Sequence, residues 1–276
     1  MRRHLVLVTL AVMLGPLGVA CGQGHEHGGR TNAGAIRKVP GNFEIKAMRG
    51  TRVSFPSLAG NAGGYLSLPD GKGVKHPAII VIQEWWGVNE WVIQETDRLA
   101  KNGYVALAVD LYRGKVATTP ETAHELMRGM PEDRALADLQ SGFKLLAARK
   151  DVDATRIGVI GWCMGGGYAL NLALAEPHLS ALSMNYGHLA SDPASIARLH
   201  APLLGNFGAL DQGIPAEDVR AFDAALKRAG KSSDIRIYEA AGHGFMNPNN
   251  KDGYVKTAAE DAQERIDRFF ARTLNP

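Results

Sequence analysis

Cysteine is scarce in this sequence, which has only Cys21 and Cys163 among its 276 residues. Two cysteines allow at most one internal disulfide, so a small fold held by several disulfides is excluded. Neither sign of charge predominates, because 31 basic and 28 acidic residues leave a net charge of only +3. The basic residues are also not gathered in runs. We therefore expect no binding to nucleic acid. No internal repeat occurs, and no motif indicates a metal ion, a nucleotide or any other cofactor.

Long hydrophobic runs are missing as well, apart from the stretch from Leu5 to Val19. It is shorter than the ~20 apolar residues of a membrane span, and it follows two arginines, which is typical of a secretory signal. Cleavage after Ala20 is one outcome, and the segment also resembles a bacterial lipoprotein signal with Cys21 as the lipidated residue. We predict that residues 1–20 are a signal peptide and that the protein is exported in a bacterium, either periplasmic or membrane-anchored through Cys21.

The overall composition, 45% hydrophobic and 21% charged, is that of a soluble globular protein with an ample core. Residues 21–42 are rich in glycine and polar side chains and read as a flexible tether. The His-Glu-His segment on this tether, at residues 25–27, is interpreted as solvated rather than as a metal site. No composition break divides residues 43–276, so one domain is predicted there.

Strand and helix patterns alternate along this domain. A helix is expected after each of two prolines, Pro120 and Pro131, because proline favours the first turn of a helix. Alternating strands and helices predict an α/β fold, with a mostly parallel sheet and helices on both faces. The predicted strands are 51–55, 64–68, 78–83, 104–111, 156–160, 181–185, 202–207 and 235–238.

The residues around Cys163 form a strand, a tight turn and a helix in succession. The apolar run 157–160 leads into the pattern Gly-x-Cys-x-Gly, from Gly161 to Gly165, and then into the helical run 168–175. Such an elbow holds its central residue in a strained conformation, and the glycines leave room for the neighbouring chain. It sets Cys163 at a helix N-terminus, where the dipole and the free N–H groups favour a thiolate. On this motif alone, a buried structural cysteine remains an alternative.

Two later residues complete a catalytic pattern. Asp211 lies in the loop after the strand 202–207, and His243 follows the strand that ends at residue 238. A nucleophile, an acid and a histidine in this chain order are typical of one large class of α/β enzymes. His243 is the only histidine after Asp211, and all three residues follow strand ends, where sites in open α/β sheets form. His188 is the weaker alternative as the base, because it precedes Asp211.

The loop from Gln83 to Gly87 follows the first buried strand and is expected to face the elbow. The backbone N–H groups of Trp85 and Met164 are then the candidate donors to an oxyanion. Glu84 is either part of the site or a carboxylate at a strand end in water. Four large aromatics lie in or just after the two loops, which indicates an apolar pocket wall, although core packing explains some of them. They are Trp85, Trp86, Trp91 and Trp162.

With these motifs the chain resembles the dienelactone hydrolase family (carboxymethylenebutenolidases), which has the α/β-hydrolase fold. The resemblance covers about residue 78 to the C-terminus and is strongest in segments 83–89, 109–112, 158–166 and 242–245. It implies a triad of Cys163, His243 and Asp211. It also implies that Glu84 holds the thiol neutral until substrate displaces it, and that an enol-lactone or related activated ester is hydrolysed through an acyl-enzyme. The residues expected to contact substrate are Trp86, Tyr112, Arg113 and Asn247.

Two departures from the family pattern bear on the substrate. Family members that act on dienelactone grip its carboxylate with two arginines, one just after the Asp-Leu-Tyr segment and one a few residues past the histidine. Arg113 lies near the first position, whereas Met246, Asn247 and Pro248 stand near the second. Without a second guanidinium, capture of a carboxylate is weaker. Dienelactone itself is therefore not the expected substrate.

Two other functions stay open at this point. One is a broad carboxylesterase or thioesterase that uses the same residues. The other is a non-catalytic, surface-tethered protein that kept the fold and the pocket for binding a small molecule. The order of Cys163, Asp211 and His243 favours an enzyme, with a small-molecule ester or lactone as the expected partner.

Overall fold

The computed structural model of the protein describes residues 48–58, 60–71 and 73–275. All of them belong to one structural unit, Ile45–Pro276. The predicted signal peptide, the tether and the lipid-anchor residue Cys21 lie outside the described residues. Among the helices in these three ranges, none is long and apolar enough to cross a membrane.

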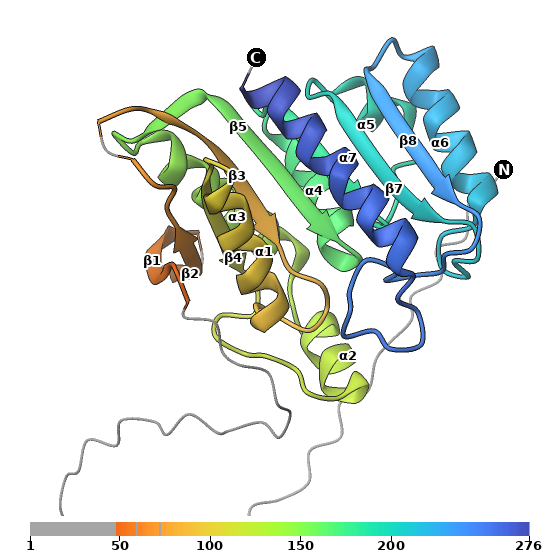
Figure 1. Ribbon diagram of the computed structural model, residues 1–276, viewed down its shortest axis with the longest axis horizontal. Helices are drawn as coiled ribbons and strands as arrows, with labels where there is room; N and C mark the ends of the chain where they lie inside the picture. Colours follow the sequence, from red (N-terminus) through yellow and green to blue (C-terminus); the bar gives the residue numbers. More distant parts are fainter. Residues whose placement is uncertain (1–47, 59, 72, 276) are drawn as a thin grey trace, which may run out of the picture. The chain divides into compact units, whose positions relative to one another are not determined.

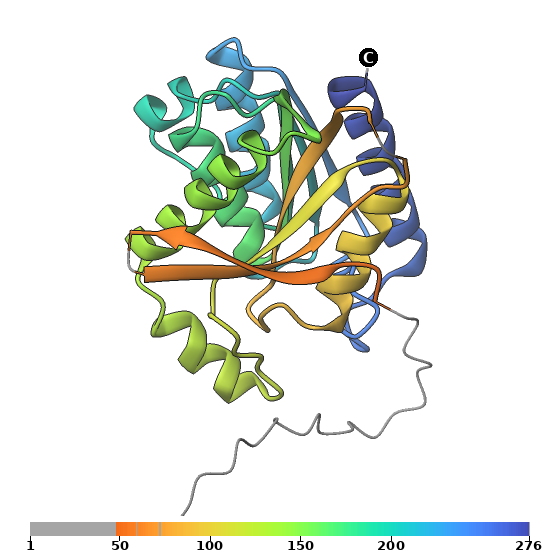
Figure 2. The same ribbon diagram turned by 90° about the vertical axis from the view of Figure 1, so that its left-hand side faces the viewer.

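Eight strands of the described residues form one sheet in the order β1-β2-β4-β3-β5-β6-β7-β8. Neighbouring strands from β4 to β8 run parallel, whereas β1 and β2 are antiparallel and run across the sheet edge in Figure 2. The predicted mostly parallel sheet is thus confirmed. The strands are β1 (Thr51–Ser57), β2 (Gly60–Ser67), β3 (His76–Ile82), β4 (Val105–Asp110), β5 (Val152–Trp162), β6 (Ala181–Asn185), β7 (Leu203–Gly208) and β8 (Ser233–Tyr238).

Helices cover both faces of this sheet (Figure 1). The helices are α1 (Glu90–Lys101), α2 (Pro120–Arg128), α3 (Glu132–Ala147), α4 (Met164–Ala175), α5 (Pro193–Ala197), α6 (Ala216–Arg228) and α7 (Lys256–Leu274). Buried residues of α3, α4, α5 and α6 pack in the core on one face. Those of α1 and α7 pack in the core on the other face.

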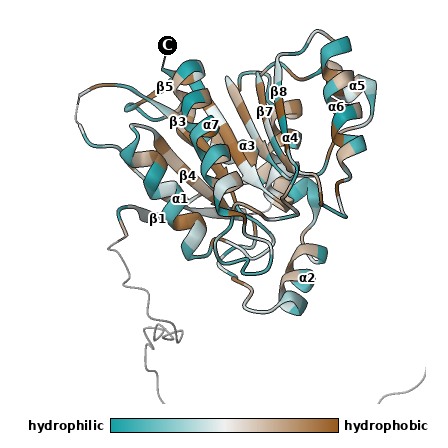
Figure 3. Ribbon diagram, turned by 45° about the vertical axis from the view of Figure 1, so that its right-hand side comes forward, coloured by the Kyte–Doolittle hydropathy of each residue, from teal (hydrophilic) through white to brown (hydrophobic). Residues whose placement is uncertain are grey.

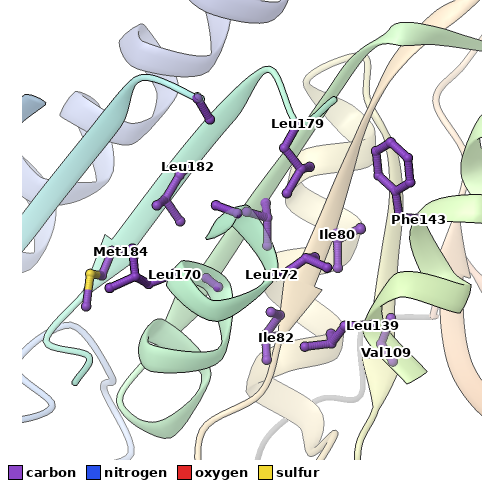
Figure 4. Close-up of a cluster of buried hydrophobic side chains, with 14 of the residues drawn as sticks. Ile80, Ile82, Val109, Leu139, Phe143, Leu170, Leu172, Leu179, Leu182 and Met184 are labelled. Carbon is purple, nitrogen blue, oxygen red and sulfur yellow. The ribbon is translucent and has the colours of Figure 1, made fainter. Parts of the chain in front are cut away.

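The two cores follow from the alternation of side chains along the strands. Within β3, Ile80 and Ile82 point into the first core and Ile79 and Val81 into the second. Because both faces of a parallel sheet are covered, its strands read as continuous apolar runs. Figure 4 shows part of the first core, where side chains of β3 and β6 meet those of α3 and α4. Hydrophobic colour lies mainly on the strands, whereas the helices show alternating bands, as expected for helices that bury one face (Figure 3).

Local sequence signals explain where several helices begin. The side chain of Asn89 accepts the N–H of Val92 at 3.1 Å and caps α1. Thr119 caps α2, and Pro120 occupies its first turn, as predicted. Pro131 is the N-cap of α3, so this helix follows its proline directly, as predicted. These signals place the loops that follow β3 and β4.

Two elements differ from the sequence-based prediction. Helix α4 starts at Met164 rather than near residue 168, although it then includes three glycines, which disfavour helix in isolation. Those glycines are needed for close packing: a Cβ on Gly165 would lie 2.4 Å from the carbonyl oxygens of Ile82 and Gln83. The short helix α5 had no predicted bounds, because five residues are too few to show a helical period.

Candidate active site

The elbow between β5 and α4 holds Cys163 in an unusual backbone conformation. Its φ is 54° and its ψ is −123°, a region that non-glycine residues seldom adopt unless the surroundings impose it. The surroundings here are backbone atoms at close range, because a Cβ on Gly161 would lie 2.0 Å from the carbonyl oxygen of Gly165. The thiol therefore stands on a sharp turn at the N-terminus of α4.

Gly161→Ala is expected to lower the free energy of unfolding by about 3 kcal/mol or more, since the added Cβ overlaps backbone that has no alternative position. Chemical denaturation measures this loss. Gly63→Ala is the matched control, because its Cβ would meet its nearest neighbour at an ordinary 3.7 Å. Equal stability of the two variants would contradict the close approach at the elbow.

Asp211, His243 and Cys163 form one hydrogen-bonded line. Asp211 follows β7, and its Oδ1 accepts the N–H groups of Gly213 and Ile214 at 2.9 and 3.1 Å. Its other oxygen, Oδ2, lies 2.7 Å from His243 Nδ1. His243 follows β8, and its Nε2 lies 3.0 Å from Cys163 Sγ. The structure thus brings together the three residues that the sequence singled out.

The charges in this line support one another. Burial lowers the pKa of His243, but its hydrogen bonds to Asp211 and Cys163 outweigh burial and raise the pKa to about 10. Burial raises the pKa of Asp211, yet the hydrogen bond to His243 leaves it below its ordinary value. An ionised Asp211 next to His243 keeps a proton on Nδ1. Nε2 is then the nitrogen that faces the thiol and can exchange a proton with it.

Glu84 is buried beside the elbow, with only 4% of its surface exposed. Its Oε2 accepts a hydrogen bond from Asn247 Nδ2 at 2.6 Å, and its Oε1 accepts one from the Tyr186 hydroxyl at 3.3 Å. Burial raises the pKa of Glu84 to about 7, against the lowering effects of Asn247, His243 and Tyr186. Among the described residues, the Cys163 thiol forms its hydrogen bond with His243, and the hydrogen bonds of Glu84 go to Asn247 and Tyr186.

The pKa of Glu84 makes stability depend on pH. Its folded-state pKa of about 7 lies above the ordinary 4.5, so its contribution is fully present below pH 4.5 and is lost as pH rises through 7. From pH 5 to pH 8 the wild type should lose roughly 2–3 kcal/mol of unfolding free energy relative to Glu84→Gln. Urea denaturation at both pH values measures the difference, with the exposed Glu217→Gln as control. A gap between wild type and Glu84→Gln that does not change with pH would show that Glu84 titrates normally.

The predicted oxyanion donors come from a helix start and from a loop. Met164 is the first residue of α4, and Trp85 lies in the loop after β3. Within the described part of the chain, neither backbone N–H donates to a protein acceptor. Both residues line the same cavity as Cys163. Their N–H groups are therefore available to an oxygen atom of a bound molecule.

A cavity of about 1350 Å³ opens above the thiol. Trp85 and Trp86 form part of its wall, with their rings 5.0 Å apart. The other two tryptophans, Trp91 and Trp162, pack on each other in the core. Further lining residues come from the region of α2, from the segment after β6 and from the loop after His243; they include Met127, Arg128, Met130, His188, Asn247 and Asn250. No three His, Cys, Asp or Glu side chains of the described ranges gather as metal ligands.

Two of the expected substrate contacts lie outside this lining. Tyr112 is buried, and its hydroxyl donates to Met164 Sδ at 3.4 Å. Arg113 pairs with the buried carboxylate of Asp138 at 3.0 Å. The guanidinium therefore serves an ion pair with α3, because a buried carboxylate without a cationic partner would be costly. Trp86 and Asn247 do line the cavity.

Tyr186 is the site residue that sequence reasoning missed. It is fully buried and follows β6 directly, with φ at 37°. Its ring meets that of His243 edge to face at 5.3 Å, and its hydroxyl binds Glu84. The rule that site residues follow strand ends would have found it. The segment after residue 185 drew attention only to His188, since histidine is the commoner catalytic residue.

The sheet order, the elbow and the residues after β7 and β8 define an α/β hydrolase. The chain belongs to the dienelactone hydrolase family, whose sequence pattern matches residues 62–274. It is 34% identical over 234 residues to a candidate carboxymethylenebutenolidase of Salmonella typhimurium, covering 80% of this chain and 86% of that one. A candidate carboxymethylenebutenolidase of Methylorubrum extorquens is 32% identical over 232 residues, covering 79% of each chain.

A solved structure shares this fold. The crystal structure of a candidate dienelactone hydrolase from Klebsiella pneumoniae superposes with a TM-score of 0.73 at 31% identity. The match covers 81% of this chain and 98% of that one. The protein is thus a dienelactone-hydrolase-like hydrolase, and its family implies a small-molecule ester or lactone as substrate.

Proposed function

We propose that this hydrolase cleaves an activated ester or enol-lactone through an acyl-enzyme formed on Cys163. The observation that carries the proposal is the continuous line from Asp211 through His243 Nε2 to the Cys163 thiol, at a strained elbow beneath the cavity. A nucleophile in contact with a base, and a base oriented by a third group, is the arrangement that covalent catalysis requires.

In the first half-reaction, His243 Nε2 holds the thiol proton and the Cys163 sulfur attacks the carbonyl carbon. The carbonyl oxygen takes up the electron pair and is stabilised by the N–H groups of Trp85 and Met164. The C–O bond to the leaving group then breaks as the carbonyl reforms. The leaving enolate or phenolate accepts the proton from His243, which leaves a thioester on Cys163.

In the second half-reaction, water attacks the thioester while His243 Nε2 accepts one of its protons. The same two N–H groups stabilise the second oxyanion. The C–S bond breaks, the acid leaves, and the proton returns to the Cys163 sulfur through His243. Asp211 keeps the imidazole oriented throughout and does not itself take the proton.

A good leaving group is expected to be required, because a thiolate is itself easily expelled from the first intermediate. Activated aryl or enol esters should exceed matched ethyl esters in kcat/KM by at least about 100-fold. Steady-state assays with p-nitrophenyl acetate, an enol-lactone and ethyl acetate measure this ratio. Equal rates on all three would contradict the requirement for a good leaving group.

The same assays, with an acyl thioester as a fourth substrate, separate the two alternatives. A broad carboxylesterase or thioesterase with these residues would hydrolyse alkyl esters or acyl thioesters as fast as the activated ones. A non-catalytic binding protein would bind a small molecule in equal amount and release no product. A burst of p-nitrophenol equal to the amount of enzyme, with a mass increase of one acetyl group on Cys163, would support the acyl-enzyme.

A further inference from the structure

A row of buried polar side chains crosses the sheet directly beneath the elbow. Asn185 of β6 and Asn206 of β7 are register partners, and both are 0% exposed. Arg265 of α7 reaches them from the face of the second core and is 6% exposed. Amide and guanidinium groups in an apolar core are costly unless each finds a hydrogen-bond partner. The hydrogen bonds of these three side chains therefore explain how the core accommodates them.

The contacts form a relay that runs in one direction. Arg265 Nη1 donates to Asn206 Oδ1 at 2.5 Å, and Asn206 Nδ2 donates to Asn185 Oδ1 at 2.8 Å. Asn185 Nδ2 then donates to the carbonyl oxygen of Gly161 at 3.1 Å. Because an arginine can only donate, the Asn206 amide must turn its oxygen toward Arg265 and its NH₂ group toward Asn185. The Asn185 amide must then turn its own oxygen toward Asn206.

At the other end of the relay, Asn185 holds the elbow on both sides of Trp162. Its side chain binds the carbonyl of Gly161, and its backbone oxygen accepts the N–H of Cys163 at 3.0 Å. The Gly161 carbonyl and the Cys163 N–H belong to the two peptide groups that precede the Cα atom of Cys163. Holding both groups fixes the approach of the chain to Cys163, where φ is 54°. A conformation of this kind persists only when the surroundings hold it.

Asn206 also supports the histidine side of the site. Its backbone oxygen accepts the N–H of Tyr186 at 2.8 Å. Tyr186 in turn packs its ring edge to face against His243 and binds Glu84. Asn185 thus supports the segment that carries the thiol, and Asn206 supports the tyrosine that packs on the imidazole.

We propose that Arg265, Asn206 and Asn185 are positioning residues, whose relay sets the orientation of the Cys163 elbow relative to His243. The proposal rests on the proposed function, because the elbow is assigned there as the nucleophile. The far end of the relay is anchored by an ion pair between Arg265 Nη2 and Asp234 Oδ1 at 2.6 Å. None of the three side chains contacts the cavity, so their effect on the reaction goes through the elbow.

Asn206→Asp tests the relay with little change in shape. The aspartate still accepts from Arg265, and as an ion pair it should hold the fold, but it offers no donor to Asn185 Oδ1. We expect kcat on p-nitrophenyl acetate to fall about 10–100-fold with KM within about twofold, the pattern of a misplaced reacting group. The rate of Cys163 alkylation by iodoacetamide, followed by mass spectrometry, should fall about 10-fold, and the unfolding midpoint should stay near that of the parent.

Two further variants at Arg265 separate positioning from general stability. Arg265→Lys keeps a cationic donor to Asn206 and should retain most of the activity, whereas Arg265→Met removes the donor and should behave like Asn206→Asp. Val219→Ala in α6, a buried site on the opposite core, is the control for lost stability. Turnover and alkylation of Asn206→Asp within twofold of the parent would overturn the proposal. The proposal would also be overturned if Val219→Ala, with the same unfolding midpoint as Asn206→Asp, lost as much kcat as that variant.

Alkylation keeps this proposal separate from the proposed function. If Cys163→Ala still turns over substrate, the acyl-enzyme is wrong. Slower alkylation of Cys163 in Asn206→Asp would even then show that the relay sets the elbow. If Cys163→Ala is inactive but alkylation and kcat of Asn206→Asp match the parent, the relay has no positioning role and the acyl-enzyme stands.

Discussion

Cys163→Ala is expected to lower kcat on p-nitrophenyl acetate by about 10⁴-fold or more, since triad residues act as a unit and the nucleophile has no substitute. His243 Nε2 lies 3.0 Å from the thiol, so without the sulfur it faces an empty position instead of a nucleophile. Residual hydrolysis from the oxyanion donors and binding alone would remain. Initial rates at saturating substrate measure the loss, and the acetyl adduct expected by mass spectrometry in the parent should be absent.

The chain supplies a matched control for this substitution. Cys21→Ala changes the other cysteine of the sequence, and the full chain carrying it should turn over like the parent. Treatment of the parent with iodoacetamide should remove activity as one label appears on Cys163. Turnover that survives Cys163→Ala would show that a different residue attacks the substrate.

Asp211→Asn is expected to cost about 10³-fold or more in kcat, because it forces His243 into the wrong tautomer. The reason is geometric. Oδ1 of Asp211 accepts the N–H groups of Gly213 and Ile214, so an asparagine must place its carbonyl there and its NH₂ group toward His243 Nδ1. The imidazole then has to accept at Nδ1 and carry its proton on Nε2, where it cannot take the proton of Cys163.

A matched aspartate is available for comparison. Asp218 lies exposed in the first turn of α6, and Asp218→Asn should leave kcat within about twofold of the parent, as is usual for surface changes away from the site. The unfolding midpoints of both variants show whether either substitution disturbs the fold. If kcat of Asp211→Asn also stayed within twofold, Asp211 would have no part in orienting His243.

Most of the fold could be predicted because its signals are local. The strand β6 was predicted at residues 181–185, as the structure has it, and β3 lies within one or two residues of its predicted ends. Apolar runs, capping residues and glycine turns determine the structure of the few residues around them. The elbow motif set Cys163 at a helix N-terminus, as the structure has it, but the helical run was recognised only from residue 168. The glycines that close packing requires there lower the helix propensity that a sequence displays.

The candidate site was only partly predictable. The order of Cys163, Asp211 and His243 along the chain, with each following a strand, was enough to bring them together. Nothing local indicated that Asn247 would bind Glu84, or that Arg113 would pair with Asp138. Each of those pairs joins residues from different elements, and the choice of partner depends on how the elements pack.

By itself, the sequence determined the kinds of elements, their order and the edge of the sheet where the reactive side chains meet. These follow from side-chain periodicity and from the parallel strands, whose ends share one edge. Only the tertiary structure decided which side chains share hydrogen bonds there, including the relay from Arg265 to Asn185. The reason is that the donor–acceptor distance of a hydrogen bond can vary by only a few tenths of an ångström. Positions of that accuracy are set by the packing of the whole domain.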